Sequence, residues 1–330
     1  MKTALLLFEL SGEHPSLPAA EVRGMLRAES PNAIFMNHPG VVIAGPCDVD
    51  RATSRLALTH RIGSYLGACD PLALEDFSSM LELPEGTLAV RGRAFEGASD
   101  GGNVDALVKK VASIVTKGRA VDLRHPQVEL RLLISDRIYF HVKLAEIDRP
   151  SFEKRKVAER PFFSPISLHP RYARALVNIA EVKKGDSVLD PFCGTGGTLI
   201  EAALVGARAF GSDIDEEMIA GTAENMAHFG VEAERLTALD IDEAASSFPN
   251  MDVVLTDLPY GRSASTRKEG VTPLYARAVP AMHACLREGG RFGIVAPIQM
   301  DLRPLTLEET HAQRVHRSLT RFYQFGFRSP

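Results

Sequence analysis

Residues 188–198 read VLDPFCGTGGT, an apolar strand that leads into a glycine-rich turn and then into a helix. Glycines in such a turn allow positive φ angles and let a ligand approach the main-chain N–H groups at the start of the helix. A strand, a tight turn and a helix in this order are typical of an α/β fold with parallel strands. The stretch therefore predicts a ligand-binding turn at the edge of such a sheet.

Outward from this turn, helical and strand patterns alternate along the second half of the chain. We expect helices over residues 171–183, 198–204, 216–229 and 274–287, and strands over residues 187–190, 207–213, 235–239, 251–257 and 291–296. A strand-rich end follows, up to residue 327. Regular alternation of this kind predicts a doubly wound, mostly parallel sheet, the α/β fold class.

The glycine turn lacks the residues of two common nucleotide-binding turns. The dinucleotide pattern G-x-G-x-x-G needs a glycine three residues after Gly196, where Leu199 stands, and no Gly-Lys-Ser/Thr of a P-loop is present. An acid at the end of the strand, Asp190, does not suit a pyrophosphate. It suits a cationic ligand such as the amino-acid end of S-adenosylmethionine.

Acidic residues also end the next two strands. Asp213 follows Asp190 at the end of the second strand, where a carboxylate can accept both hydroxyls of a ribose. Asp215 is predicted to cap the following helix. Asp240 follows the third strand, where its side chain can accept the amine of adenine. Acids at successive strand ends indicate one site.

Residues 253–261 read VVLTDLPYG and end the fourth strand of the parallel set. They resemble the (Asp/Asn)-Pro-Pro-(Tyr/Phe) motif of amino-group methyltransferases, and the turn around Asp190 resembles the partner motif of that group. The resemblance implies that Asp257 and the carbonyl of Leu258 accept the two hydrogens of a planar amine, turning its lone pair toward a sulfonium methyl. Tyr260 would stack on the base. Leu258 replaces the first proline, and we expect the chemistry to survive with a slightly less stiff loop.

The first half of the chain has an α+β pattern. We expect a strand over residues 86–95, a helix over residues 103–117 and a hairpin formed by residues 128–133 and 138–142. Residues 147–165 contain prolines and an excess of basic side chains, so they are predicted to be a basic linker. Five arginines near the carboxyl end, Arg303, Arg314, Arg317, Arg321 and Arg328, are further candidates for phosphate contacts.

Residues 121–131, VDLRHPQVELR, and residues 137–140 resemble the closing part of a THUMP domain, a module of tRNA-modifying enzymes. With both methyltransferase motifs, the chain resembles archaeal THUMP-containing tRNA methyltransferases that modify N2 of guanosine at position 10. The resemblance implies a class I Rossmann-like methyltransferase domain at residues 166–330, after a ferredoxin-like part at residues 1–55, a THUMP domain at residues 56–146 and the linker. In this family the target guanine leaves its base pair to reach the pocket.

The candidate site residues fall into three sets. The cofactor-binding set is Asp190, Phe192, Cys193, Gly194, Thr195, Gly196, Asp213, Ile214, Asp240 and Ile241, with Cys193 interpreted as a packing residue. The catalytic set is Asp257, Leu258, Pro259 and Tyr260. The RNA-binding set is Lys154, Arg155, Lys156 and Arg160. S-adenosylmethionine is the expected cofactor, and no metal is expected.

Length and composition set limits on the class of protein. A chain of 330 residues predicts two or three domains, and a net charge of −4 argues against a uniformly basic nucleic-acid binder. The four cysteines form no C-x-x-C pair, and no apolar run is long enough for a signal peptide or a membrane span. We therefore expect a cytoplasmic protein. The family resemblance implies that it is a monomer that acts on tRNA without an obligatory protein partner.

Several alternatives stay open from the sequence. Relatives that methylate guanosine 6 of tRNA share both motifs, and enzymes that methylate adenine N6 or cytosine N4 in DNA use the same chemistry. A non-catalytic RNA-binding protein and a nicotinamide-dependent oxidoreductase are rivals, and Leu199 argues against the latter. The transfer of one or two methyl groups is also undecided.

Overall fold

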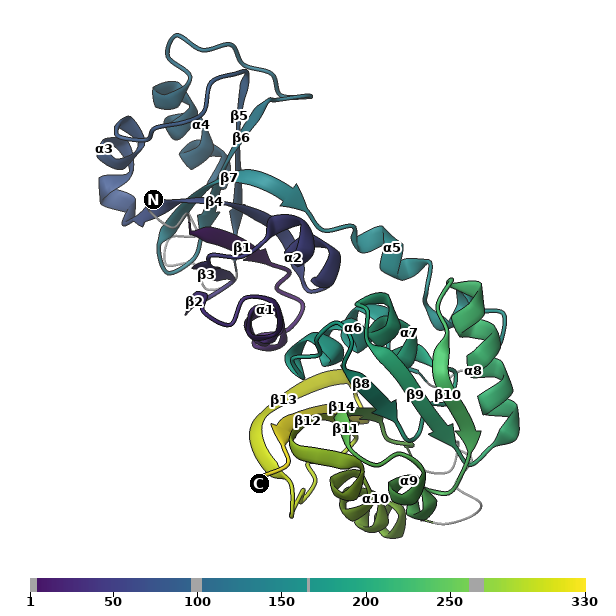
Figure 1. The fold of residues 1–330 in the computed structure, drawn as a ribbon. Coiled ribbons are helices and arrows are strands. Elements are labelled where there is room, and N and C mark those ends of the chain that lie inside the picture. Colours follow the sequence, from purple (N-terminus) through teal and green to yellow (C-terminus); the bar gives the residue numbers. More distant parts are fainter. Residues whose placement is uncertain (1–4, 96–102, 165–166, 261–269) are drawn as a thin grey trace. The chain divides into compact units, whose positions relative to one another are not determined.

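The computed structural model describes residues 5–95, 103–164, 167–260 and 270–330 (Figure 1). The chain divides into two compact units. The first comprises Met1–Ser54 and Leu58–Ile147, and the second comprises Arg55–Ala57 and Asp148–Pro330. Each unit is built on a seven-stranded sheet.

The sheet of the first unit is mostly antiparallel and has the order β2-β3-β1-β4-β7-β6-β5. Its strands are β1 (Leu6–Leu10), β2 (Ile34–His38), β3 (Val41–Gly45), β4 (Thr59–Cys69), β5 (Leu88–Ala94), β6 (Val128–Ile134) and β7 (Ile138–Glu146). The pair β5 and β6 is parallel. The predicted strand over residues 86–95 and the predicted hairpin, now β6 and β7, are confirmed.

Helices pack against inner and outer strands of this sheet. The helical segments of the first unit are α1 (Leu17–Glu29), α2 (Val49–Arg55), η1 (Pro71–Ala73), α3 (Leu74–Ser79) and α4 (Val104–Val115). The predicted helix over residues 103–117 is α4, which Asn103 caps by accepting the Ala106 N–H. Val111 of α4 packs against Leu130 and Phe140 of the sheet.

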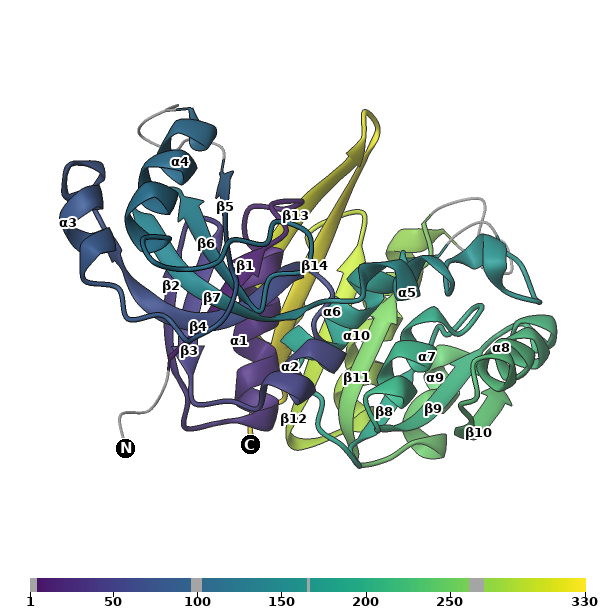
Figure 2. The ribbon, with the colours of Figure 1, turned by 90° about the horizontal axis from the view of Figure 1, so that it is seen from above.

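The second unit contains the predicted doubly wound sheet, in the order β10-β9-β8-β11-β12-β14-β13. Its strands are β8 (Ser187–Asp190), β9 (Arg208–Asp213), β10 (Ala233–Ala238), β11 (Met251–Asp257), β12 (Leu286–Ala296), β13 (Thr306–His316) and β14 (Leu319–Phe327). The first five strands in this order are parallel. The strand-rich end is an antiparallel hairpin, β13 and β14, which Figure 2 shows in yellow.

Helices flank both faces of this second sheet (Figure 1). The helical segments of the second unit are α5 (Arg149–Glu153), η2 (Val157–Glu159), α6 (Pro170–Ile179), α7 (Gly197–Leu204), α8 (Glu216–His228), α9 (Ile241–Ser247) and α10 (Val271–Cys285). Gly293 of β12 meets Leu176 of α6 on one face. The neighbouring Ile294 belongs to the core cluster that α10 closes on the other face.

Three elements differ from the sequence expectation. Helix α6 ends at Ile179 rather than at residue 183, because Glu181 takes a positive φ of 59° that a helix does not accommodate. Strand β12 begins at Leu286, which pairs with Met251. Helix α9 has only seven residues and was not predicted.

Candidate active site

The predicted acids meet at the carboxyl edge of the second sheet. Asp190 ends β8, Asp213 ends β9 and Asp257 ends β11. Strand β8 lies between β9 and β11, so the order of the strands reverses there. Such a switch point opens a crevice outside the strand ends, which is where α/β sheets bind ligands.

The glycine turn is tied to the neighbouring strand and helix. Gly194 and Gly196 have φ angles of 52° and 79°, and Gly196 precedes α7 directly. The Gly194 N–H donates to the Asp213 carboxylate at 3.0 Å, and the Thr222 hydroxyl donates to the Gly194 carbonyl at 2.6 Å. These bonds bring Asp213 and the turn together, as the sequence predicted.

Asp190 is a buried carboxyl group that lacks a cationic partner. Its exposed fraction is 2%, and it accepts the Phe192 N–H at 3.1 Å. Burial raises the pKa of Asp190 to about 7. No positive side chain in the described part of the chain pairs with it. A ligand cation would restore its charged form, because an opposite charge stabilises a buried carboxylate.

Asp213 and its neighbour Asp215 have different tasks. Burial raises the pKa of Asp213, although it accepts the N–H groups of Gly194 and Asp215. Each carboxylate oxygen retains a lone pair for a further donor. Asp215 accepts the Glu217 N–H at 2.9 Å and caps α8, which confirms that part of the prediction.

Asp240 follows β10 but is engaged within the protein. It caps α9, accepting the Asp242 N–H, and the Glu243 side chain accepts the Asp240 N–H in return. Arg277 also donates to Asp240 at 2.6 Å. The adjacent Ile241 is buried in the core. Any contact of the Asp240 carboxylate with a bound adenine therefore competes with its bonds to the Asp242 N–H and to Arg277.

Asp257 and Tyr260 are in direct contact. The Tyr260 hydroxyl donates to the Asp257 carboxylate. Burial raises the pKa of Asp257 to about 6, against the lowering effects of this hydrogen bond and of Arg321. The carboxyl group is therefore mostly ionised at neutral pH, and it is basic enough to take up a proton from a reacting group.

Leu258 and Pro259 hold the loop after β11 in place. The Leu258 N–H donates to the Val295 carbonyl at 2.9 Å, so the ladder between β11 and β12 continues past Asp257. The Leu258 side chain is buried. The Tyr275 hydroxyl donates to the Pro259 carbonyl at 2.7 Å. Gly261, the last residue of the motif, lies outside the described residues.

Two functional candidates were missed by the sequence reasoning. Tyr275 supports the loop from α10, and no spacing connects it to the motif. Arg321 was grouped with surface arginines, but its guanidinium lies 5.6 Å from the centroid of the Tyr260 ring. Only the pairing of β14 with β12 brings it to this edge.

The predicted RNA-binding set is divided by the structure. Arg155 donates to Glu201 at 2.7 Å. Arg160 is 6% exposed and donates to the Thr195 hydroxyl at 2.9 Å, so it supports the glycine turn from inside. Lys154 is exposed, and Lys156 forms only a loose ion pair. The two lysines, but not the two arginines, face solvent.

Cys193 was interpreted as a packing residue. Cys193 is buried, and burial raises the pKa of its thiol. Tyr323 and Phe325 are fully buried. The packing interpretation of Cys193 is confirmed by its burial.

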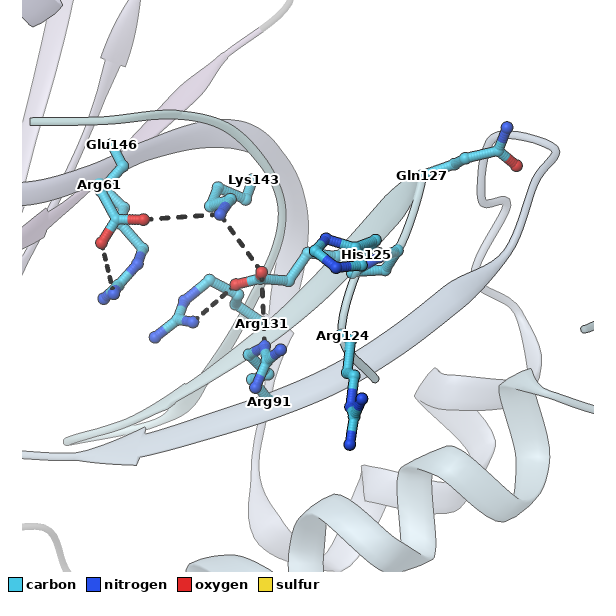
Figure 3. Close-up of a pocket in the computed structure, with 10 residues that line it drawn as sticks. Arg61, Arg91, Arg124, His125, Gln127, Arg131, Lys143 and Glu146 are labelled. Carbon is cyan, nitrogen blue, oxygen red and sulfur yellow. Dashed lines mark hydrogen bonds and ion pairs between the residues drawn. The ribbon is translucent and has the colours of Figure 1, made fainter. Parts of the chain in front are cut away.

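A basic pocket of about 490 Å³ lies in the first unit (Figure 3). It is lined by Arg61, Arg91, Arg124, His125, Pro126, Gln127, Glu129, Arg131, Lys143 and Glu146. Glu129 pairs with Arg131 at 2.8 Å and with Lys143 at 3.3 Å. Arg124 is exposed and has no ion pair with the described residues. Five cationic side chains against two acidic ones make the pocket an anion-binding candidate.

Within the described ranges, no cluster of three His, Cys, Asp or Glu side chains is arranged to hold a metal ion. No helix there has the length and apolar character to span a membrane.

Comparisons with known proteins agree with this geometry. A family model of the RMKL-like methyltransferase domain matches residues 158–322. The chain is 37% identical to the tRNA (guanine(10)-N2)-dimethyltransferase of Methanothermobacter thermautotrophicus over 94% of this chain and 96% of that protein. It is 32% identical to the Pyrococcus abyssi protein of the same name, over 96% and 97% of the two chains.

Among solved structures, TrmN from Thermus thermophilus is 25% identical, has a TM-score of 0.58, and the match covers 98% of this chain and 99% of that chain. The predicted Rossmann-like methyltransferase fold is thus confirmed. On the strength of the full-length relatives, the chain belongs to the family of archaeal tRNA (guanine(10)-N2)-dimethyltransferases.

Proposed function

We propose that the protein transfers a methyl group from S-adenosylmethionine to the exocyclic N2 of guanosine 10 in tRNA. The observation that carries this proposal is the position of Asp257. Its carboxylate ends β11 beside the glycine turn after β8, where the strand order reverses. An acceptor for an amine and a site for a cationic methyl donor therefore share one edge of the sheet.

The residues of the turn fit this cofactor. S-adenosylmethionine supplies a methyl group activated by a sulfonium. The buried Asp190 would take the charge of the ammonium, and Asp213 would accept the ribose hydroxyls with its remaining lone pairs. Phe192, Cys193, Thr195 and Ile214 shape the walls, and Asp240 and Ile241 are the candidates next to the adenine.

Asp257 and the Leu258 carbonyl would accept the two N–H bonds of guanine N2. These bonds would make the nitrogen pyramidal, so that its lone pair is no longer delocalised into the ring and can face the methyl carbon. As the N–C bond forms and the S–C bond breaks, the nitrogen becomes acidic and one proton passes to the Asp257 carboxylate. Tyr260 and Pro259 complete the wall against which the base lies.

We infer that RNA is held by the first unit and by the linker. The first unit would comprise the ferredoxin-like part at residues 1–55 and the THUMP domain at residues 56–146, and residues 147–165 would link it to the methyltransferase domain at residues 166–330. The basic pocket around Arg91 and Arg124 suits phosphate groups, as do Lys154 and Lys156. The protein would act as a cytoplasmic monomer without a protein partner.

The test is to incubate the purified chain with unmodified tRNA and labelled S-adenosylmethionine. We expect label at N2 of guanosine 10, and mass analysis of that nucleoside shows whether one or two methyl groups are added. Label at guanosine 6 or in DNA would assign a different target. Cofactor binding without any transfer would support a non-catalytic RNA-binding protein instead, and binding of a nicotinamide cofactor would support an oxidoreductase.

Asp257→Asn is the decisive variant. It keeps the size of the side chain but removes the charge that accepts the proton, so we expect turnover to fall by about 10²-fold or more. Binding of S-adenosylmethionine, measured by calorimetry, should stay within about twofold, since Asp190 and the turn remain. Asp301→Asn is the matched control, because Asp301 is exposed and its partner is the exposed Arg303. Normal turnover in Asp257→Asn would refute the assignment.

A further inference from the structure

The antiparallel strand β14 places one cation at the candidate site. In β14, Phe322 pairs with Ala296 and Tyr323 with Val295 of β12, and Val295 in turn pairs with Asp257 of β11. The start of β14 therefore lies at the carboxyl edge of the parallel strands. Arg321 is at that start.

Arg321 contacts the aromatic residue of the motif. Its guanidinium carbon lies 5.6 Å from the centroid of the Tyr260 ring, within the range of a cation–π contact. Tyr260 in turn donates its hydroxyl to Asp257. The Arg321 Nε is buried and has no hydrogen-bond acceptor among the described residues. The three side chains form one cluster, which we call the Asp257–Tyr260–Arg321 cluster.

The edge of the sheet otherwise carries an excess of negative charge. Asp190, Asp213 and Asp257 end three adjacent strands. A buried carboxylate near other carboxylates tends to take up a proton. Arg321 is the cation that acts on Asp257, and it favours the charged carboxylate.

Tyr260 must change its position during the proposed reaction. In this structure its hydroxyl donates to the Asp257 carboxylate, which is the acceptor that the guanine amine would use. In the reaction, the Tyr260 ring would lie on the guanine instead. When the base enters and Tyr260 releases Asp257, a charged carboxylate loses one hydrogen bond. A cation that stays nearby can compensate for that loss.

We propose that Arg321 is a positioning residue of the proposed methyl transfer: it holds the Tyr260 ring and balances the charge of Asp257 while Tyr260 moves from the carboxylate onto the guanine. This inference rests on the proposed function. It explains why a half-buried arginine stands on β14 and interacts electrostatically with Asp257 and Tyr260. It also assigns a task to a residue outside both sequence motifs.

The charge of Asp257 depends on a small set of neighbours. The titratable groups that face Asp257 from the surrounding elements are Asp190 of β8, Tyr260 of the following loop, Tyr275 of α10, and Arg321 and Tyr323 of β14, and of these Tyr260 and Arg321 lower its pKa. Burial raises the pKa of Tyr275 to about 12 and that of Tyr323 further, so both are neutral near pH 7. Among the described residues, Arg321 is the charged group that lowers the pKa of Asp257.

The experiment compares Arg321→Met and Arg321→Lys with the unchanged protein at saturating tRNA and S-adenosylmethionine. Removal of the cation should raise the pKa of Asp257 above its present value of about 6. A shift of about one pKa unit makes the loss of kcat in Arg321→Met about threefold larger at pH 6.5 than at pH 8.5. Arg321→Lys should restore the pH profile but not full turnover, because an ammonium stacks less well on a ring.

A second readout does not depend on the substrate. In protein labelled with ¹³C at aspartate carboxyl groups, the signal that disappears in Asp257→Asn is that of Asp257, and its titration should move to higher pH in Arg321→Met. If the chain methylates no tRNA but this shift is observed, the proposed function is wrong. The effect of Arg321 on the charge of Asp257 is then still supported. An unchanged titration and pH profile would overturn the role of Arg321, as would a change confined to the KM for tRNA.

Arg287→Met is the matched control for folding and charge. Arg287 pairs with Asp252 near the opposite end of β11. Its replacement therefore removes the same positive charge as Arg321→Met, but at a position far from the site. Thermal melting of both variants identifies any general loss of folding. If Arg321→Met melts early, Arg321→Lys still decides the question through its pH profile.

Discussion

Leu258 stands where related amino-group methyltransferase motifs have proline. Unlike proline, Leu258 has a main-chain N–H that can donate a hydrogen bond. That N–H donates to the Val295 carbonyl, and the side chain is buried against the core beneath β11. The sequence led us to expect a slightly less stiff loop. The structure instead shows a ladder bond that fixes the residue directly after Asp257.

We therefore predict that Leu258→Pro destabilises the second unit. It removes the N–H, leaves the buried Val295 carbonyl unsatisfied and shrinks a packed side chain, at a cost of about 2 kcal/mol or more. Thermal melting should show a fall of about 4 °C or more. Leu258→Met keeps the N–H and the volume, and should change the melting temperature by less. Equal melting temperatures for the two variants would contradict this account.

Arg155 and Arg160 show that charge alone does not identify an RNA contact. Glu201 is buried and needs cations, which Arg155 and Arg174 supply at 2.7 and 2.8 Å. Burial lowers the pKa of Arg160 to about 10, yet it remains charged and donates to Thr195. Arg160 thus holds the glycine turn and Arg155 binds α7, whereas Lys154 and Lys156 are open to a phosphate.

At the scale of elements, the glycine turn is held between α7 and α8. A Cβ atom added at Gly196 would lie 2.9 Å from the Thr222 methyl group of α8, and the φ angle there is positive. At Gly194, which also has a positive φ, the nearest atom is 4.0 Å away. Backbone conformation therefore restricts both positions, and packing restricts only Gly196.

Alanine at these two positions should separate strain from packing. The positive φ costs about 1–2 kcal/mol in either variant, and Gly196→Ala adds the clash with Thr222. Thr222→Ser removes the methyl group and keeps the hydroxyl bond to Gly194, so it should recover at least about 0.5 kcal/mol of the Gly196→Ala loss. Thermal melting measures the stability of the two single variants and of the double variant, and calorimetry measures how tightly each binds S-adenosylmethionine. Additive losses would mean that the contact with Thr222 is unimportant.

Helix α9 illustrates the competition between local structure and ligand binding. Its seven residues are capped at Asp240, which also binds Arg277. A helix this short depends on its caps and on packing, because nucleation is costly. The sequence signal for it was present, since Asp240 is followed three residues later by Glu243, the pattern of a capping box.

At the scale of the whole molecule, the two units carry different chemistry. The second unit has its acids at one sheet edge, whereas the first unit has a pocket lined mainly by cations. The overall charge of −4 hides this division, because the acidic and basic regions nearly cancel. A local basic region is sufficient for contact with phosphates.

We predict that Arg91→Ala with Arg124→Ala weakens tRNA binding without affecting the methyl transfer itself. Each lost phosphate contact should raise the KM for tRNA and reduce the slope of log affinity against log salt by about 1, with kcat unchanged. Arg27→Ala, on α1 of the same unit, is the matched control because Arg27 is exposed and lies outside the pocket. A fall in kcat with unchanged KM would contradict the assignment of the pocket.

The sequence by itself determined the class of the second unit and the edge that carries the site. Asp190, Asp213 and Asp257 each end a strand of an alternating pattern, and parallel strands bring such ends to one edge. The sequence also predicted the hairpin of β6 and β7 and the helix α4, because the spacing of apolar residues within each element is enough to identify it. Motifs and residue spacing therefore predicted the features that local sequence determines, namely helices, strands and the residues at strand ends.

Only the tertiary structure decided which side chains share a contact across that edge. Arg321 reaches Tyr260 because β14 is antiparallel to β12, and this register leaves no trace in the spacing of the residues. Arg160 is buried and Leu258 donates to Val295 for the same reason: burial and hydrogen bonding depend on segments distant in the sequence. The groups that pack against a charged side chain or an N–H determine which partner it contacts. That packing exists only in the folded chain.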